Sequence, residues 1–240
     1  MTISIIPLCV GILRNLPKSI LVGAKGLNSS IDVPSIMWYL KGTKENIIVD
    51  TGPSVPLGQS SHLSSVEKTP DHEIEKVLAS VGVCISEVKI VINTHLHWDH
   101  CSSNKLFKNA EFITQRKELQ YAIAPFMSHQ SAYEPKDNFL SVINRFNLVD
   151  GDEEIIPGVQ VIQLPGHTPG HQGVLVKCDN ANYLISGDCI GLYESWDECL
   201  IGSIYVNLEE YYASFKKIAN LDAKILPGHD EKVFSTKEFC

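Results

Sequence analysis

One short motif constrains this chain more than any other part of it, because residues 95–100 read His-Leu-His-Trp-Asp-His. Three further potential ligands follow at separate places: His167, Asp188 and His229. Imidazole and carboxylate groups suit Zn²⁺ and its neighbours in the first transition row, and two such ions close together can share and deprotonate one water. The fold must therefore bring four distant segments together, and the pattern predicts a two-metal hydrolytic site.

The spacing inside the motif allows one hexapeptide to serve two ions. Residues two apart in an extended segment share a face, so His95 and His97 can hold one ion together. If the chain then curls into a helix, Asp99 and His100 turn toward a neighbouring position. The remaining ligands must come from elsewhere, with His167 completing the first ion, His229 completing the second and Asp188 bridging both.

The elements expected around these motifs alternate between strands and helices. We expect strands at 36–40, 46–50, 88–92, 110–114, 159–164, 173–177, 182–186 and 223–226. We expect helices from Thr69-Pro70 to Gly82, from Arg116 to Ala124, and after Asn207 with an apolar side at Leu208, Tyr211, Tyr212, Phe215 and Ala219. Segment 126–147 has no clear pattern. Strands followed by helices in both halves predict a sheet-on-sheet core with helices outside, as a single domain spanning residues 1–240.

Composition narrows the class of function. The net charge is -8 and no Lys/Arg run interrupts the mixture of charges, which argues against a nucleic-acid partner and favours a small neutral or cationic substrate. No apolar run approaches the 18 residues of a membrane span, and the N-terminal apolar stretch lacks a basic start and contains Pro7, unlike a signal peptide. Seven cysteines without C-x-x-C spacing fit a reducing compartment, so we expect a cytoplasmic protein without membrane association.

The ligand motifs resemble those of the metallo-β-lactamase superfamily, whose signature is H-x-H-x-D-H followed by separate His, Asp and His ligands. The similarity runs along the chain and includes Asp50-Thr51-Gly52. It implies an α/β fold, an αββα four-layer sandwich of two similar halves with the metal site at the edge of the sheets. It also implies two Zn²⁺ ions, with Mn²⁺, Fe²⁺ or Co²⁺ as alternatives. The implied ligands are His95, His97 and His167 for the first metal, Asp99, His100 and His229 for the second, and Asp188 as the bridge.

Within this superfamily the chain is most similar to the N-acyl homoserine lactonases that quench bacterial quorum sensing. Segments 50–53, 95–100, 115–119 and 166–172 carry the similarity. It implies a hydrolase that opens a lactone ring by attack of a metal-bridging hydroxide, with Asp99 transferring the proton to the leaving alkoxide. These lactonases often carry a tyrosine shortly after the bridging aspartate. Tyr193, five positions after Asp188 and so off the usual spacing, is the candidate for polarising the substrate carbonyl.

Other functions remain open on the same ligands. Another small-lactone hydrolase, such as one acting on a pyridoxine-derived lactone, is the nearest alternative. A thioesterase of the glyoxalase II type would need a C-terminal region with basic glutathione contacts, which we do not expect in the short segment 230–240. A metal-stabilised binding module is the alternative from another class, although such a module should have lost a ligand and none is missing. The expected partner is a small-molecule lactone, and the oligomeric state stays open, with a homodimer allowed.

Several residues near the motifs receive a structural expectation. We expect His171 to orient a ligand loop as a hydrogen-bond donor outside the ligand set. Cys101 and Cys189 are expected to pack as small apolar residues. For the aromatic and apolar residues of segment 126–147, core filling is favoured over lining an acyl pocket; these are Phe126, Met127, Tyr133 and Phe139. Three histidines are expected to be ordinary surface or loop residues: His62, His72 and His129.

Overall fold

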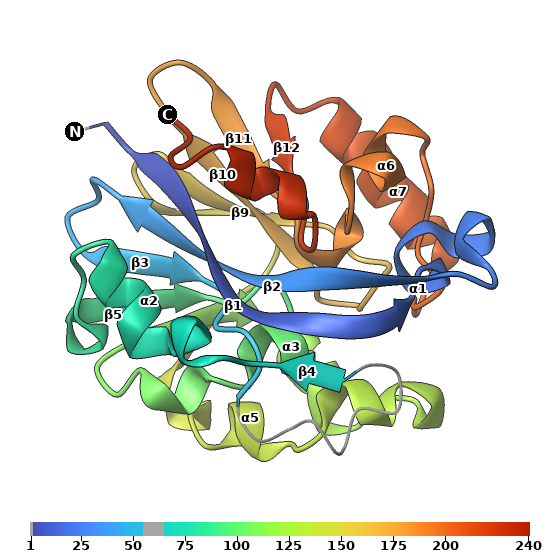
Figure 1. The fold of residues 1–240 in the computed structure, drawn as a ribbon, viewed down its shortest axis with the longest axis horizontal. Helices are drawn as coiled ribbons and strands as arrows, with labels where there is room; N and C mark the ends of the chain where they lie inside the picture. Colours follow the sequence, from blue (N-terminus) through green and yellow to red (C-terminus); the bar gives the residue numbers. More distant parts are fainter. Residues whose placement is uncertain (1, 55–64) are drawn as a thin grey trace.

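Two β-sheets lie face to face at the centre of the protein (Figure 1). The computed structural model describes residues 2–54 and 65–240; His62 lies outside the described residues. The first sheet contains β1 (Ser4–Pro17), β2 (Ser30–Lys41), β3 (Asn46–Val49), β4 (Ser65–Glu67), β5 (Val88–Ile92), β6 (Glu111–Gln115) and β7 (Phe146–Val149), in the order β4-β1-β2-β3-β5-β6-β7. The second contains β8 (Glu153–Ile156), β9 (Val159–Gln163), β10 (Gln172–Lys177), β11 (Asn182–Ile185) and β12 (Lys224–Leu226), in the order β12-β11-β10-β9-β8.

Alternation along the strands divides their apolar side chains between two layers. In β3, Ile47 and Val49 point into the core between the sheets, whereas Ile48 points to the outer face of the first sheet. In β10, Val174 and Val176 enter the same inner core from the second sheet. Successive strand residues face opposite sides, so a strand covered on both faces must be apolar throughout. The nearly continuous apolar run predicted as a strand at 88–92 is β5, which confirms that prediction; its one polar residue, Lys89, is exposed.

Helices cover both outer faces. The helix α2 (Ile74–Ser80) packs Ile74, Val77 and Leu78 against the outer face of the first sheet. The helix α7 (Leu208–Ala219) packs against the outer face of the second sheet. The layer order is therefore αββα, as expected (Figure 1).

The remaining helices are short and lie in the connections. The α-helices are α1 (Ser19–Val22), α3 (Trp98–Cys101), α4 (Arg116–Ile123), α5 (Asp137–Leu140) and α6 (Tyr193–Asp197). The 3-10 helices are Gly23–Gly26, Pro70–His72, Ile85–Glu87, Asn104–Leu106, Met127–Tyr133, Ile143–Arg145, Gly187–Cys189 and Glu231–Ser235. No helix among residues 2–54 and 65–240 is long and apolar enough to cross a membrane.

Helix α7 begins as expected, and Tyr211 and Phe215 are buried as expected, but the rest of its buried face differs from the prediction. Asn207 caps it, because its side-chain oxygen accepts hydrogen bonds from the backbone N–H groups of Glu209 and Glu210 at 3.0 and 3.1 Å. Of the residues expected on the apolar side, Leu208 and Tyr212 are 40% and 49% exposed, and Ala219 is exposed too. The buried face consists of Tyr211, Ser214, Phe215 and Ile218. These four residues are three and four positions apart, as expected for one face of a helix. The prediction that Tyr212 is buried, which relied on its apolar character, was wrong.

Two further expectations need correction. The helix expected from Thr69 starts only at Ile74, because Thr69 caps a separate 3-10 turn and Glu73 is extended. The predicted end of the helix is confirmed, since Gly82 has a positive φ of 78° just beyond it.

The strand β1 was not predicted from the sequence. It is buried on both faces and its register against β2 shifts between Cys9 and Gly11, so the sequence lacks a regular alternation there.

The segment without a clear pattern, 126–147, folds into short helical turns. Tyr133 and Phe139 are fully buried beside Leu96 and Leu119, so they fill a core as favoured. Phe126 and Met127 are instead 62% and 87% exposed. Cys101 and Cys189 are both buried in apolar clusters, in the packing role expected of them.

The packing of α2 gives a stability prediction. Leu78 is fully buried on the outer face of the first sheet, so we expect Leu78→Ala to lower the free energy of unfolding by about 2–5 kcal/mol, the usual cost of such a cavity. Glu75→Ala, on the exposed side of the same helix, should change it by less than about 0.5 kcal/mol. Denaturant unfolding of both variants measures the difference, and equal effects would contradict this account of the layer.

Candidate metal centre

The seven predicted ligands converge at the edge of the sandwich where several strands end. They lie in the loops that follow β5, β9, β11 and β12. Within each of two groups the donor atoms lie within 4.8 Å of one another; the groups are His95, His97, His167 and Asp188, and Asp99, His100, Asp188 and His229. Asp188 belongs to both. This is the division that the spacing of the motif predicted.

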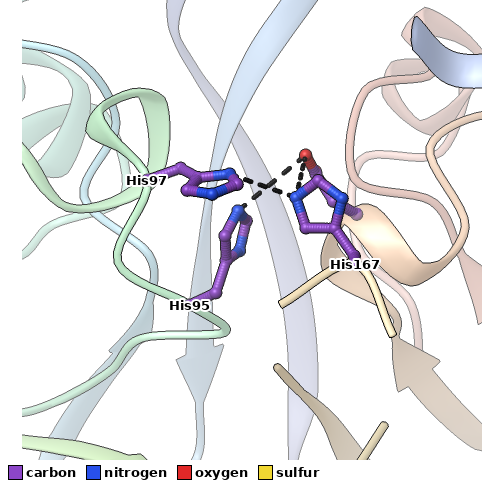
Figure 2. A group of neighbouring side chains, drawn as sticks. His95, His97 and His167 are labelled. Carbon is purple, nitrogen blue, oxygen red and sulfur yellow. Dashed lines mark hydrogen bonds and ion pairs between the residues drawn. The ribbon is translucent and has the colours of Figure 1, made fainter. Parts of the chain in front are cut away.

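Three imidazoles and one carboxylate oxygen form the first group. Figure 2 shows His95, His97 and His167 pointing toward a common centre. His167 Nε2 lies 3.1 Å from His97 Nδ1 and 3.4 Å from Asp188 Oδ2, while His95 Nε2 lies 3.9 Å from the same oxygen. These donor atoms lie close enough together to share one cation.

The second group surrounds the other oxygen of Asp188. His100 Nε2 and His229 Nε2 lie 3.1 and 3.0 Å from Asp188 Oδ1, and both lie 3.7 Å from Asp99 Oδ2. The α3 helix directs Asp99 and His100 toward this neighbouring group, as expected, while the His100 ring stays 4.2 Å from the His95 ring, centroid to centroid. Because its two oxygens face different groups, Asp188 has the geometry of a shared ligand.

Hydrogen bonds behind the site fix how most of the imidazoles present their nitrogens. The Nδ1 atoms of His167 and His229 lie 2.9 Å from the backbone carbonyls of Ile204 and Pro34, so Nδ1–H donates and Nε2 keeps its lone pair. His100 Nδ1 similarly faces Asp50 Oδ2 at 2.8 Å. Such outer partners orient metal-binding histidines and fix their tautomer. His97 differs, because it directs Nδ1 inward.

Asp50 is a positioning residue whose role the sequence did not reveal. It follows β3 with a positive φ of 57° and is almost fully buried. Besides the contact with His100, its carboxylate accepts hydrogen bonds at 2.8 Å from the backbone N–H and the hydroxyl of Thr94. In the sequence, Asp50-Thr51-Gly52 was significant only for its resemblance to the metallo-β-lactamase superfamily. The feature that could have predicted the positioning role is a carboxylate directly after a buried strand.

His171 lies behind Asp188 but not in the role expected. Its Nε2 accepts a hydrogen bond from the backbone N–H of Asp188 at 3.1 Å. Burial lowers the pKa of His171 to about 3, which keeps the ring neutral and able to accept. The residue does orient a ligand loop, but as an acceptor and not as a donor.

Burial and neighbouring groups shift the pKa values of several of these ligands. Burial lowers the pKa of His95 and His97 well below the usual value, so these rings are neutral. Burial opposes the charge on Asp188, but His100 and His229 outweigh it and hold the pKa of Asp188 well below its usual range. Within residues 2–54 and 65–240, His95 Nε2, His100 Nε2 and Asp188 Oδ1 are buried without a hydrogen-bond partner. Unsatisfied buried atoms are costly, and here all three face the places where metals would bind.

Tyr193 is not brought to the ligand groups. Its backbone N–H donates to Asp230 Oδ2 at 2.9 Å, and its ring packs against the apolar core between the sheets. The residue starts α6 and is not among those that line the pocket beside the ligands. Tyr211 lies nearer: its hydroxyl donates to the backbone carbonyl of Asp188 at 2.6 Å.

A pocket opens directly on both ligand groups. His97, Asp99, His167, Asp188 and His229 form one side of it. The rest of the lining comes mostly from the end of β1 and from α1 and, apart from Ser131, is apolar. We call its larger apolar side chains the apolar wall: Leu13, Leu16, Ile20, Leu21, Trp98 and Ile204. The site therefore combines strongly polar ligands with an apolar surface.

Comparison with known proteins identifies the family of this chain. The family model of the metallo-β-lactamase superfamily matches residues 32–229. An N-acyl homoserine lactonase from a Bacillus species is 32% identical over 161 residues, which cover 63% of this chain and 61% of that protein. The matched region thus spans about three fifths of that relative. The N-acyl homoserine lactonase AttM of Azorhizobium caulinodans is 26% identical over 228 residues, covering 86% and 85% of the two chains.

A solved structure extends the likeness to the whole fold. The structure of a quorum-quenching N-acyl homoserine lactone hydrolase superposes with a TM-score of 0.78 at 25% identity, covering 97% of this chain and 95% of the other. The expected fold and the expected family are both confirmed by these matches. From its sequence, its αββα architecture and its family match, the chain belongs to the metallo-β-lactamase superfamily.

Proposed function

We propose that this protein is a dinuclear metal-dependent hydrolase that opens the ring of N-acyl homoserine lactones. The observation that carries the proposal is the pocket, in which the candidate metal ligands face an apolar wall. An N-acyl homoserine lactone has the matching halves, a polar ring with a reactive carbonyl and an apolar chain. The lactonases of Bacillus and Azorhizobium support the same substrate class.

The apolar wall would hold the acyl chain. Leu13, Leu16, Leu21 and Ile204 line the same pocket as Asp99 and Asp188. A chain bound against these apolar residues would leave the ring beside the two carboxylates. Each buried methylene contributes about 0.8 kcal/mol to binding. Binding energy from the chain would therefore place the carbonyl at the reacting groups.

The candidate ligands suit Zn²⁺, with Mn²⁺, Fe²⁺ and Co²⁺ as alternatives. His95, His97 and His167 would hold one ion, Asp99, His100 and His229 the other, and Asp188 both. Bound there, the two ions supply Lewis acidity and make water nucleophilic near neutral pH. The chain contributes neutral imidazoles fixed by outer hydrogen bonds and a pocket that positions the ring.

Asp99 is the proposed proton carrier. Its side chain is 13% exposed and lines the pocket, so it reaches the substrate as well as the second ligand group. It would take a proton from the attacking water as the carbon–oxygen bond forms. It would return that proton to the ring oxygen as the ester bond breaks, which leaves a carboxylic acid and an alcohol.

The alternatives fit the pocket less well. Among the described residues that line it there is no Lys or Arg, whereas a glutathione thioester would present carboxylates to be paired. A pyridoxine-derived lactone has no chain to occupy the apolar wall. A binding module without catalysis would not require Asp99 to be both a ligand and open to the pocket.

The substrate class can be tested with the full chain loaded with Zn²⁺. We expect two ions per chain by elemental analysis, and acid release from homoserine lactones in a pH-stat that exceeds release from thioesters, phosphodiesters and β-lactams. Lactones with longer acyl chains should have higher kcat/KM until the wall is filled. Chelation should abolish the activity and added Zn²⁺ should restore it. A metal-loaded protein that prefers a thioester would refute the lactonase assignment.

A second prediction concerns Asp99. We expect Asp99→Asn to lower turnover of the best lactone by about a hundredfold or more, since a general acid/base contributes about 10²–10⁴. The matched control is Asp197→Asn, an exposed aspartate on α6, which should turn over at the wild-type rate. Metal content of both variants must be measured alongside. Near-normal turnover of Asp99→Asn with two bound ions would show that another group carries the proton.

The position of Tyr193 gives a third prediction. Removing one donor to a developing oxyanion typically costs about 10²–10³ in rate. Because Tyr193 packs against the inter-sheet core, we expect Tyr193→Phe to change kcat by less than about threefold. A tenfold or larger fall in kcat, with metal content and stability unchanged, would restore Tyr193 to the mechanism.

A further inference from the structure

Glu118 is a buried carboxylate to which no role in the site has been assigned. It lies in the first turn of α4, and none of its surface is exposed. It stands between the loop that carries His95 and His97 and the loop that carries His167. A fully buried carboxylate is costly unless several donors compensate it, so its partners indicate what it does.

Four donors from three segments surround the carboxylate. Oε1 accepts hydrogen bonds from the backbone N–H of Leu96 and from the Tyr133 hydroxyl, both at 3.0 Å. Oε2 accepts from the Thr168 hydroxyl at 2.5 Å and from the backbone N–H of Gly170 at 3.2 Å. Each oxygen therefore holds a different loop, with Leu96 on one side and Thr168 and Gly170 on the other.

These donors are next to the ligands of the first group. Leu96 lies between His95 and His97, and Thr168 directly follows His167. The Tyr133 ring contacts His97 edge to face, with ring centroids 4.7 Å apart. Gly170 lies directly against the start of α4, because a Cβ there would come within 2.1 Å of the Glu118 backbone nitrogen. No other residue type fits that approach, so the His167 loop is fixed against the same turn.

We propose that Glu118 is the positioning residue of the first metal site, a clamp that holds its two ligand loops at the separation where three imidazoles share one ion. The proposal rests on the metal centre of the proposed function, but not on the choice of substrate. The second group has other supports, since Asp50 orients His100 and the Pro34 carbonyl orients His229. Loss of the clamp should therefore affect one ion and spare the other.

The chemistry of the clamp requires a carboxylate. All four partners can donate, and an ionised carboxylate offers acceptors on both oxygens. Glutamine has nearly the same shape but only one acceptor oxygen. In Glu118→Gln the amide N–H₂ must face either the Leu96 N–H or the Gly170 N–H, and neither can turn to accept. One ligand loop would thus lose its attachment while the rest of the core keeps its volume.

Metal titration of the full chain tests the proposal. Wild-type protein freed of metal should bind two Co²⁺ ions. Elemental analysis measures how many ions are bound, and the visible absorption of bound Co²⁺ monitors their coordination. For Glu118→Gln we expect one ion to bind with wild-type affinity and the other at least about tenfold more weakly, with the spectrum of the first ion changed. Two ions bound with wild-type affinity and spectrum would overturn the proposal.

Controls separate positioning from general instability. Leu78→Ala disturbs a core remote from the site, so it should lower stability while keeping both ions. If Leu78→Ala also loses one ion selectively, the effect is one of stability and the proposal fails.

If Glu118→Gln does not fold, Thr168→Val and Tyr133→Phe each remove one donor, and each should weaken the binding of the same single ion to a smaller extent. If neither Thr168→Val nor Tyr133→Phe weakens the binding of that ion, the proposal is overturned. A wild-type chain that binds two ions but opens no lactone would contradict the proposed substrate and leave the clamp intact.

Discussion

The Asp188 carboxylate is the point on which the two halves of the site depend. Each of its oxygens faces imidazole nitrogens of a different group, at 3.0 to 3.9 Å. Its loop follows β11 in the second sheet, whereas His95, His97 and His100 follow β5 in the first. The groups can therefore form only when the two sheets pack in one register. Correct packing of the two sheets therefore also assembles the site.

Buried amides secure that register beneath the site. The Gln115 side chain, at the end of β6, donates to Gln172 at the start of β10 at 2.9 Å. Gln172 in turn donates to the Asn93 carbonyl after β5, also at 2.9 Å. These groups are fully or almost fully buried, so an error in sheet packing would leave their hydrogen bonds unmade at a cost of about 1–3 kcal/mol each. Polar groups in the core thus favour one alignment of the two sheets over other alignments that would bury a similar amount of apolar surface.

The sequence predicted the geometry inside the 95–100 motif well because that part of the site is local. Alternation places His95 and His97 on one face, and a single helical turn redirects Asp99 and His100. Long-range features were predicted less well. The strand β1 has no alternation to detect, since both of its faces are buried. The roles of Asp50 and Glu118 depend on partners 15 to 52 positions away along the chain. The catalytic role of Tyr193 was predicted from spacing and resemblance alone, whereas its ring packs against the core between the sheets.

The apolar wall of the pocket has a separate origin from the ligands. Leu13 and Leu16 end β1, and Ile20 and Leu21 belong to α1, far from the ligand loops in sequence. This segment contacts α6 through the Lys18–Glu194 ion pair at 2.6 Å, outside both ligand groups. Substitutions in the wall can therefore reshape the space for a substrate without touching a ligand or its supports. Such a division lets descendants of one ancestral enzyme diverge in what they accept while inheriting the same reactive centre.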